Sequence, residues 1–122
     1  MDILTVPQFD ILTVPQLIAV IGTFATGFYA LFWPKAVRGF TGLRFDDGRG
    51  MTEIRAVMGG FFIGLAAAAF FLEQRVTYPM LGITYLAVAA VRLVSMFVDD
   101  SVIKSNIISL FVEIVFGVVL VL

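Results

Sequence analysis

The chain has 122 residues, enough for one domain, and 61% of them are hydrophobic, with a mean hydropathy of +1.06. A soluble domain of this size would expose much apolar surface to water at a cost of about 25 cal/mol per Å², so the composition predicts an integral membrane protein. The net charge of −1 excludes a nucleic-acid partner, and the absence of cysteine and histidine excludes disulfides, cysteine-ligated metals and the commonest haem ligand, so we expect neither cofactor nor metal.

The first 16 residues form a tandem repeat, because DILTVPQ at Asp2–Gln8 returns at Asp10–Gln16. Pro7 and Pro15 argue against one continuous helix through it. The segment also lacks the basic start and cleavage site of a secretory signal. We interpret residues 1–16 as an arm separate from a membrane domain at 17–122. It is either a recent duplication without a role or an interfacial arm that touches a partner.

Four segments of the membrane domain are about as long and apolar as a bilayer span, which needs about 20 residues. They cover about 17–33, 51–72, 78–98 and 105–122, and Pro34 ends the first of them. Helices are required because lipid cannot satisfy free backbone groups. Since the connections are short except for 34–50, the sequence predicts an all-α fold, an antiparallel four-helix bundle.

Basic residues are concentrated on one predicted side of the membrane. Four crossings place both termini on one side and the 34–50 and 99–104 loops on the other, and these loops carry Lys35, Arg38, Arg44, Arg49 and Lys104. The side of the termini has only Arg75. Positive charge accumulates in the cytoplasm, so we expect the 34–50 loop to be cytoplasmic and both termini to be outside. In that loop Arg38, Arg44 and Arg49 are candidates to contact anionic lipid headgroups, and FDDGRG at Phe45–Gly50 predicts a turn.

Two charged residues fall within predicted spans. Arg92 lies seven residues before Asp99, about 10 Å from the cytoplasmic end of its helix, and Glu113 lies nine residues after Lys104, about 13 Å in. Isolated charges at mid-membrane cost about 2.5–3.5 kcal/mol on insertion scales. We therefore predict that Glu113 pairs with Arg92, with Glu53 as a second acceptor.

Helical spacing groups polar and small residues on single faces. Arg92, Ser95 and Asp99 share one face, and Asn106, Ser109 and Glu113 share another. Glu53, Ala56, Gly60 and Gly64 line up on the second span, and Gly60-x-x-x-Gly64 favours close approach of a neighbouring helix. The predicted polar cluster comprises Glu53, Arg55, Arg92, Ser95, Asp99 and Glu113. Tyr29, Trp33, Tyr78 and Tyr85 lie near helix ends, as interfacial anchors do.

Three stretches resemble a known group. TEIRAVMGG (Thr52–Gly60), AAVRLVSMFVD (Ala89–Asp99) and FVEIVFG (Phe111–Gly117) resemble the bacterial family called domain of unknown function 4345, over roughly 17–122. The matching positions are Glu53, Arg55, Gly59, Gly60, Arg92, Ser95 and Glu113. The resemblance implies a small four-helix protein of a bacterial inner membrane and no particular activity, substrate or partner.

The sequence leaves the function open between two main hypotheses. The favoured one is a non-catalytic structural or accessory subunit of a membrane complex or homo-oligomer, in which the Arg92–Glu113 pair only fixes helix register. The alternative is a small-solute or ion carrier that uses the same pair as a binding site. An enzyme acting on lipid headgroups through Glu53, Arg55 and Asp99 has no specific support, so we expect no enzymatic activity.

Overall fold

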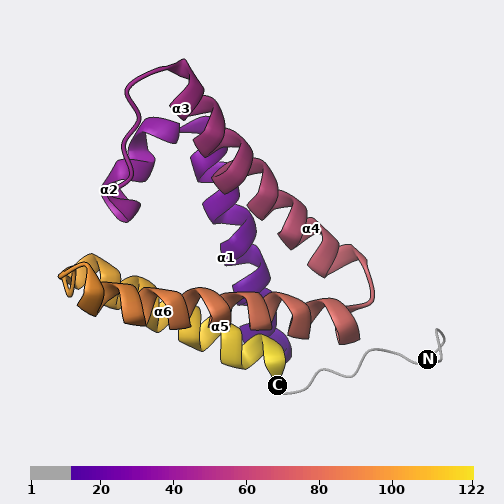
Figure 1. The fold of residues 1–122 in the computed structure, drawn as a ribbon. Coiled ribbons are helices and arrows are strands. Elements are labelled where there is room, and N and C mark those ends of the chain that lie inside the picture. The colour runs from indigo at the N-terminus through magenta and orange to yellow at the C-terminus, as the bar shows by residue number, and fades with distance from the viewer. Residues whose placement is uncertain (1–11) are drawn as a thin grey trace.

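The computed structural model describes residues 12–122, which are mostly helical and contain no strand. The elements are α1 (Thr13–Phe32), η1 (Pro34–Ala36), α2 (Val37–Thr41), α3 (Gly48–Glu53), η2 (Ile54–Phe61), α4 (Phe62–Phe71), α5 (Gln74–Val98) and α6 (Lys104–Val121). η1 is a 3₁₀ turn and η2 is a π-helical segment. α3, η2 and α4 follow one another without a break as one long helix (Figure 1).

Four helices are long and apolar enough to cross a bilayer. They are Thr13–Phe32, Gly48–Phe71, Gln74–Val98 and Lys104–Val121, with 20, 24, 25 and 18 residues. Large apolar side chains project outward from them, and Phe71, Phe97 and Phe111 are 80%, 72% and 68% exposed. Such a surface suits lipid and would be costly in water. The predicted all-α fold is confirmed for residues 12–122, as are four helices long and apolar enough to span a membrane.

Two helices begin four residues earlier than predicted. α1 begins at Thr13, so the end of the second repeat is helical, while residues 1–11 of the predicted arm lie outside the described part. Pro15 is compatible with this start because the first turn of a helix has no internal partner for its N–H groups. α5 begins at Gln74 and contains Pro79. Its first turn includes the exposed Arg75, which the apolar pattern placed outside the span and which lies 3.0 Å from Glu73.

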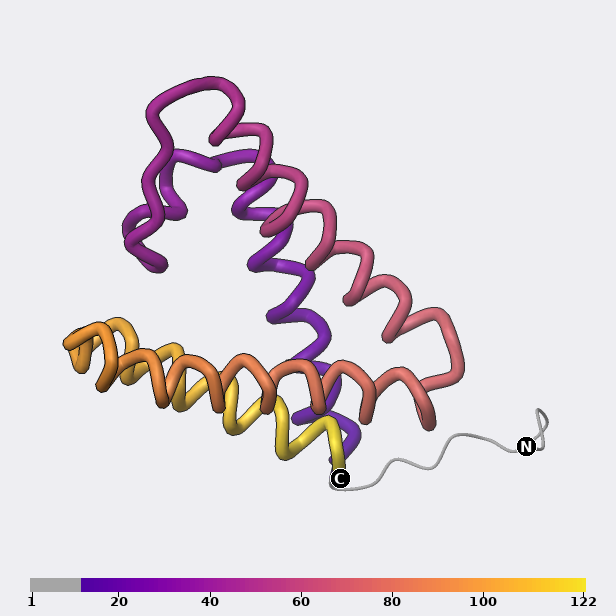
Figure 2. Tube along the Cα trace, viewed as in Figure 1, coloured from indigo at the N-terminus to yellow at the C-terminus, as the bar shows by residue number. Residues whose placement is uncertain are grey.

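The spans are arranged as two antiparallel hairpins (Figure 2). The first hairpin pairs α1 with the α3–η2–α4 helix, and the second hairpin pairs α5 with α6. Glycines allow close contact in both. A Cβ atom at Gly27 would lie 2.8 Å from the carbonyl oxygen of Gly59, and one at Gly82 would lie 2.8 Å from that of Gly117. Backbones approach this closely only where no side chain intervenes.

The predicted helix packing through Gly60 and Gly64 is wrong within this chain. Both residues are exposed; a Cβ at Gly64 would meet nothing within 4 Å, and one at Gly60 would meet only the Arg55 carbonyl at 3.9 Å. The packing residue is Gly59, whose Cβ would lie 3.0 Å from the Cβ of Leu31. Adjacent helical residues point about 100° apart, so Gly59 and Gly60 cannot both face α1. The π-helical turns of η2 also displace the faces expected from a regular α-helical period.

The two hairpins meet at one end of the molecule. There a buried core combines small side chains of α1 and α4 with larger ones of α5 and α6, namely Ala19, Val20, Ala66, Ala69, Tyr78, Leu81 and Leu120. Gln16 Nε2 donates to the Val119 carbonyl at 3.1 Å, and Thr77 Oγ1 donates to the Ala69 carbonyl at 2.9 Å. The first bond holds the start of α1 beside the end of α6, and the second joins α5 to α4.

Toward their opposite ends the hairpins diverge (Figures 1 and 2). The turn of the first hairpin has its own small core, formed by Ala30, Val37 and Ile54 with Phe45 and Met58 against them. α2 folds back from this turn toward the second hairpin (Figure 1). The bundle is therefore closed where the hairpins meet and open at the far end.

Candidate functional site

Arg92 and Glu113 form the predicted ion pair between α5 and α6. Arg92 Nε donates to both carboxylate oxygens of Glu113, at 2.6 and 3.0 Å, and Arg92 Nη2 lies 2.6 Å from Oε1. The helices are joined by the turn 99–103, in which Asp100 has a positive φ of 51°. This forked geometry is the strongest form of the arginine–carboxylate interaction. The prediction from depth and charge is confirmed for these two residues.

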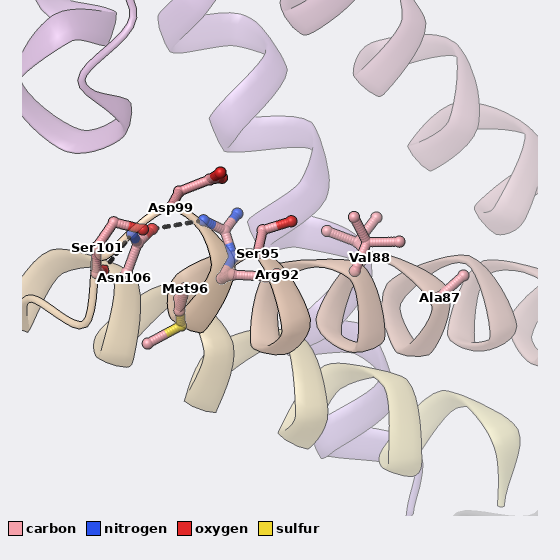
Figure 3. Close-up of a pocket in the computed structure, with 9 residues that line it drawn as sticks. Ala87, Val88, Arg92, Ser95, Met96, Asp99, Ser101 and Asn106 are labelled. Carbon is pink, nitrogen blue, oxygen red and sulfur yellow. Dashed lines mark hydrogen bonds between the residues drawn. The ribbon is translucent and has the colours of Figure 1, made fainter.

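Asn106 extends the pair toward the turn. Its Oδ1 accepts from Arg92 Nη1 at 2.9 Å, and its Nδ2 donates to the Ser101 carbonyl at 2.9 Å (Figure 3). Asn106 was outside the predicted cluster, although it lies seven residues before Glu113 on the same face of α6. That spacing is the signal that could have identified it. The amide fixes the guanidinium from the side opposite the carboxylate.

The other members of the predicted cluster do not join this network. Glu53 and Arg55 are exposed on the first hairpin, and Glu53 makes no ion pair with Arg92. The prediction failed because the hairpins diverge at this end. Ser95 and Asp99 lie on the Arg92 side of α5, but neither hydrogen-bonds to it (Figure 3). Together with Arg92 they line a shallow hollow of about 540 Å³.

The basic residues predicted to contact lipid are exposed in the segment between α1 and η2. Arg38 lies on α2, Arg44 precedes the turn, and Arg49 lies on α3. The turn predicted at Phe45–Gly50 leads into α3, where Asp47 caps the helix by accepting from the Gly50 N–H at 3.0 Å. With the exposed Lys35, this segment thus presents four cations at the turn of the first hairpin.

A crevice of about 630 Å³ occupies the space between the two hairpins. Its apolar lining includes Phe40, Met58, Phe61, Phe62, Leu65, Leu81, Ile108, Val112 and Phe116. Its polar lining consists of Thr23, Thr26, Thr41, Thr84, Tyr85, Arg92, Ser105, Asn106, Ser109 and Glu113. This volume falls within the range of about 300–1,000 Å³ typical of small-molecule sites, which are also mostly apolar with a few polar groups.

Tyr85 closes the crevice where the hairpins converge. Its hydroxyl hydrogen-bonds to Thr23 on α1, and its ring packs edge-on against Phe116 with the ring centroids 5.6 Å apart. The interpretation of Tyr85 as an interfacial anchor is wrong, as it is for Tyr78, which is buried in the core. Tyr29 and Trp33 are 43% and 55% exposed near the end of α1, as interfacial anchors are.

Arg92 lies on the border between the crevice and the shallow hollow, since it lines both. Its side chain is 31% exposed, whereas that of Glu113 is 9% exposed. A guanidinium carries five N–H groups. Nε–H donates to Glu113 and one N–H of Nη1 donates to Asn106, while Nη2 lies 2.6 Å from Glu113 Oε1, so at least two of the five have no acceptor among residues 12–122. The pair is buried on the carboxylate side and accessible on the arginine side.

The sequence matches a family model over almost its whole length. The model described as Domain of unknown function (DUF4345) matches residues 11–122. The chain belongs to this family. Two of the stretches that suggested DUF4345, Ala89–Asp99 and Phe111–Gly117, meet at the Arg92–Glu113 pair, and Thr52–Gly60 contributes the packing residue Gly59. A search of curated proteins and one of solved structures gave no match.

The geometry limits the chemistry available to this DUF4345 domain. Glu113 has both oxygens occupied by Arg92, which leaves it poorly placed to bind a cation or to accept a proton from a substrate. Within residues 12–122 there is no group of three or more acidic side chains that could hold a metal ion. The remaining polar groups of the crevice are hydroxyls and amides. Such a wall is suited to hydrogen bonding with a bound molecule.

Proposed function

We propose that this DUF4345 protein binds a lipophilic small molecule within the membrane, in the crevice between its two hairpins. The observation that carries the proposal is the position of Arg92 on the wall of a largely apolar cavity, with part of its guanidinium facing the open space. A pair that only fixed helix register would be expected to be enclosed on both sides. Intramembrane ionisable residues most often mark binding sites or transport routes.

This proposal keeps the binding site of the carrier hypothesis and takes a small solute, not an ion, as its ligand. Glu113 is engaged by Arg92 at 2.6 Å, so a cation would have to break the pair before reaching the carboxylate. For the same reason we propose binding without catalysis, since the carboxylate nearest the cavity is not free to act as a base. Whether the bound molecule is carried across the membrane or only held is a question for transport assays.

We further propose that the protein lies in a bacterial inner membrane with both termini outside. Support comes from the exposed cations of the segment between α1 and η2, among them Arg38, Arg44 and Arg49, which the positive-inside rule assigns to the cytoplasm. In this orientation the three arginines would face the anionic headgroups of the inner leaflet. The open end of the crevice would then face the cytoplasmic half of the bilayer.

An accessory-subunit role is a second candidate, favoured by one observation. Gly60 and Gly64 lie on an outward face of the second span with no side chain of another helix against them. Glycines one turn apart on a lipid-facing surface allow close approach of another helix. Replacing Gly64 by leucine would leave the fold of the single chain intact. A loss of co-purifying chains in that variant would therefore support assembly through this face.

The binding proposal can be tested with a variant that fills the crevice. Thr84 lines it and is exposed, whereas Ala90 is exposed on the same helix and lines neither cavity. Native mass spectrometry of protein extracted in mild detergent should find a bound small molecule in the wild type and in Ala90→Phe. Occupancy should fall several-fold in Thr84→Phe. Equal occupancy in both variants would show that any bound molecule lies elsewhere, and the proposal would be withdrawn.

A further inference from the structure

The crevice has no net formal charge on its wall. Among the described residues that line it, from 12 to 122, only Arg92 and Glu113 are charged, and they neutralise each other through the forked contact. The adjoining hollow adds Asp99, an exposed carboxylate on the same side of α5 as Arg92 (Figure 3). A ligand with a negative head would therefore meet an arginine that already has its counter-ion and a second acid nearby. A ligand with a positive head would compete with Arg92 for Glu113.

Most of the donors on the wall are already used. Thr26 donates to the Gly22 carbonyl at 2.8 Å and Thr84 donates to the Met80 carbonyl at 3.0 Å. Thr23 donates its single hydroxyl hydrogen to the Ala19 carbonyl at 2.8 Å, so Tyr85 must be the donor in the Tyr85–Thr23 bond. The hydroxyl groups of these residues can still accept hydrogen bonds, but they have no hydrogen left to give.

Unused donors on the wall remain at Arg92, at the second Nδ2–H of Asn106, and at the Ser105 and Ser109 hydroxyls. The two N–H groups of Arg92 without an acceptor among residues 12–122 are the strongest of these, because a charged donor forms shorter and stronger bonds. A bound molecule that displaces water from the crevice must place an acceptor there, since a donor left without a partner costs free energy. A carbonyl oxygen satisfies two N–H groups without adding charge.

We infer that the crevice selects an uncharged lipophile whose carbonyl group accepts hydrogen bonds from Arg92 while its apolar body lies among the aromatic and aliphatic side chains. This inference rests on the proposed binding function and narrows its ligand class. An ester-bearing neutral lipid and a lipophilic ketone or quinone share this chemistry. Fatty acid anions and alkylammonium cations are excluded by the charge balance of the wall.

The inferred ligand class is tested by measuring how tightly the protein, held in nanodiscs, binds a series of probes with the same chain length. The probes are methyl tetradecanoate, tetradecanesulfonate, tetradecyltrimethylammonium and tetradecane, each compared between wild type and Thr84→Phe so that only binding in the crevice is counted. The methyl ester should bind at least about tenfold more tightly than either ion at equal concentration in the bilayer, since placing a net charge there is costly. Tetradecane should bind more weakly than the ester, because it leaves the Arg92 N–H groups without an acceptor.

A charge-changing variant gives the sharper result. Glu113→Gln leaves Arg92 without its counter-ion, so the preference should shift toward the sulfonate by about tenfold or more relative to the ester. The control is the double variant Arg92→Gln with Glu113→Gln, in which the wall is again neutral and the sulfonate should gain nothing. If Glu113→Gln does not fold, the wild-type series alone decides.

The outcomes distinguish a failure of the proposed binding function from a failure of the inferred ligand class. If no probe binds in a manner that Thr84→Phe abolishes, the proposed function fails. If binding in the crevice is found but the sulfonate or the ammonium equals or exceeds the ester, the function stands and the inference of a neutral ligand is overturned. An ester preference that reverses in Glu113→Gln supports both.

Discussion

Replacing Glu113 by glutamine should destabilise the fold through the charge that it leaves on Arg92. Removing one partner of a fully buried ion pair costs about 3–5 kcal/mol, and removing one from an exposed pair costs about 0–1 kcal/mol. The pair lies between these cases, because the side chain of Glu113 is 9% exposed and that of Arg92 is 31% exposed. We therefore expect a loss of about 2 kcal/mol in the free energy of unfolding for Glu113→Gln, and a similar loss for Arg92→Gln.

The double variant is expected to recover most of this loss. Two glutamines can hydrogen-bond to each other without either charge, and neutral replacements of buried pairs are often tolerated. If the double variant lies within about 1 kcal/mol of the wild type, the coupling energy is at least about 3 kcal/mol, at the upper end for residues in contact. Steric trapping in bicelles, with tags on α1 and α6, measures the free energies. Ser95→Ala is the control, because Ser95 lies one turn from Arg92 without bonding to it and should change stability by less than about 0.5 kcal/mol.

Strictly additive single variants would refute this reasoning. A coupling energy below about 0.5 kcal/mol would mean that the contact at 2.6 Å contributes nothing measurable to the fold. The charge balance that underlies the inferred ligand class would then lose its physical basis.

Three further predictions follow from single contacts and can be measured by the same unfolding assay. Gly27→Ala should cost about 1–3 kcal/mol, because its Cβ would lie 2.8 Å from a backbone carbonyl, whereas Gly64→Ala should leave the single chain unchanged; equal effects would contradict the packing described. Asn106→Ala should cost about 1–2 kcal/mol, because Arg92 and the Ser101 carbonyl both lose a partner, and a neutral result would mean that water replaces the amide. Asp47→Ala should cost about 1 kcal/mol through loss of the α3 cap, and Asp47→Asn should restore it; hydrogen exchange at Gly50 would report the change directly.

The sequence predicted the features that depend on length, polarity and depth. The four spans follow from runs of apolar residues, and the Arg92–Glu113 pair follows from the cost of isolated charges at similar depth on neighbouring helices. Neither the four spans nor the ion pair depends on the angle at which the helices cross. The start of α1 was misplaced because a proline in the first turn looks the same in the sequence as one that breaks a helix.

The predictions that were wrong concern contacts that depend on the arrangement of the two hairpins. The divergence of the hairpins separates Glu53 and Arg55 from the pair, and no local sequence pattern indicates that divergence. Gly59 and Gly60 are adjacent, and only the direction of approach of α1 decides which of them packs. Tyr85 was placed at the interface because it lies near the predicted end of its helix, although its hydroxyl finds a partner on α1 inside the molecule.

The separation of the two charges along the chain has a consequence for biosynthesis. Arg92 precedes Glu113 by 21 residues, so a ribosome releases the whole of α5 before the carboxylate that neutralises it. If α5 left the insertion channel alone, it would carry an uncompensated guanidinium into lipid. If it stayed until α6 arrived, the two helices would enter as a neutral hairpin. We therefore expect α5 and α6 to insert together, so that the ion pair is part of the order in which the protein is assembled as well as of its finished form.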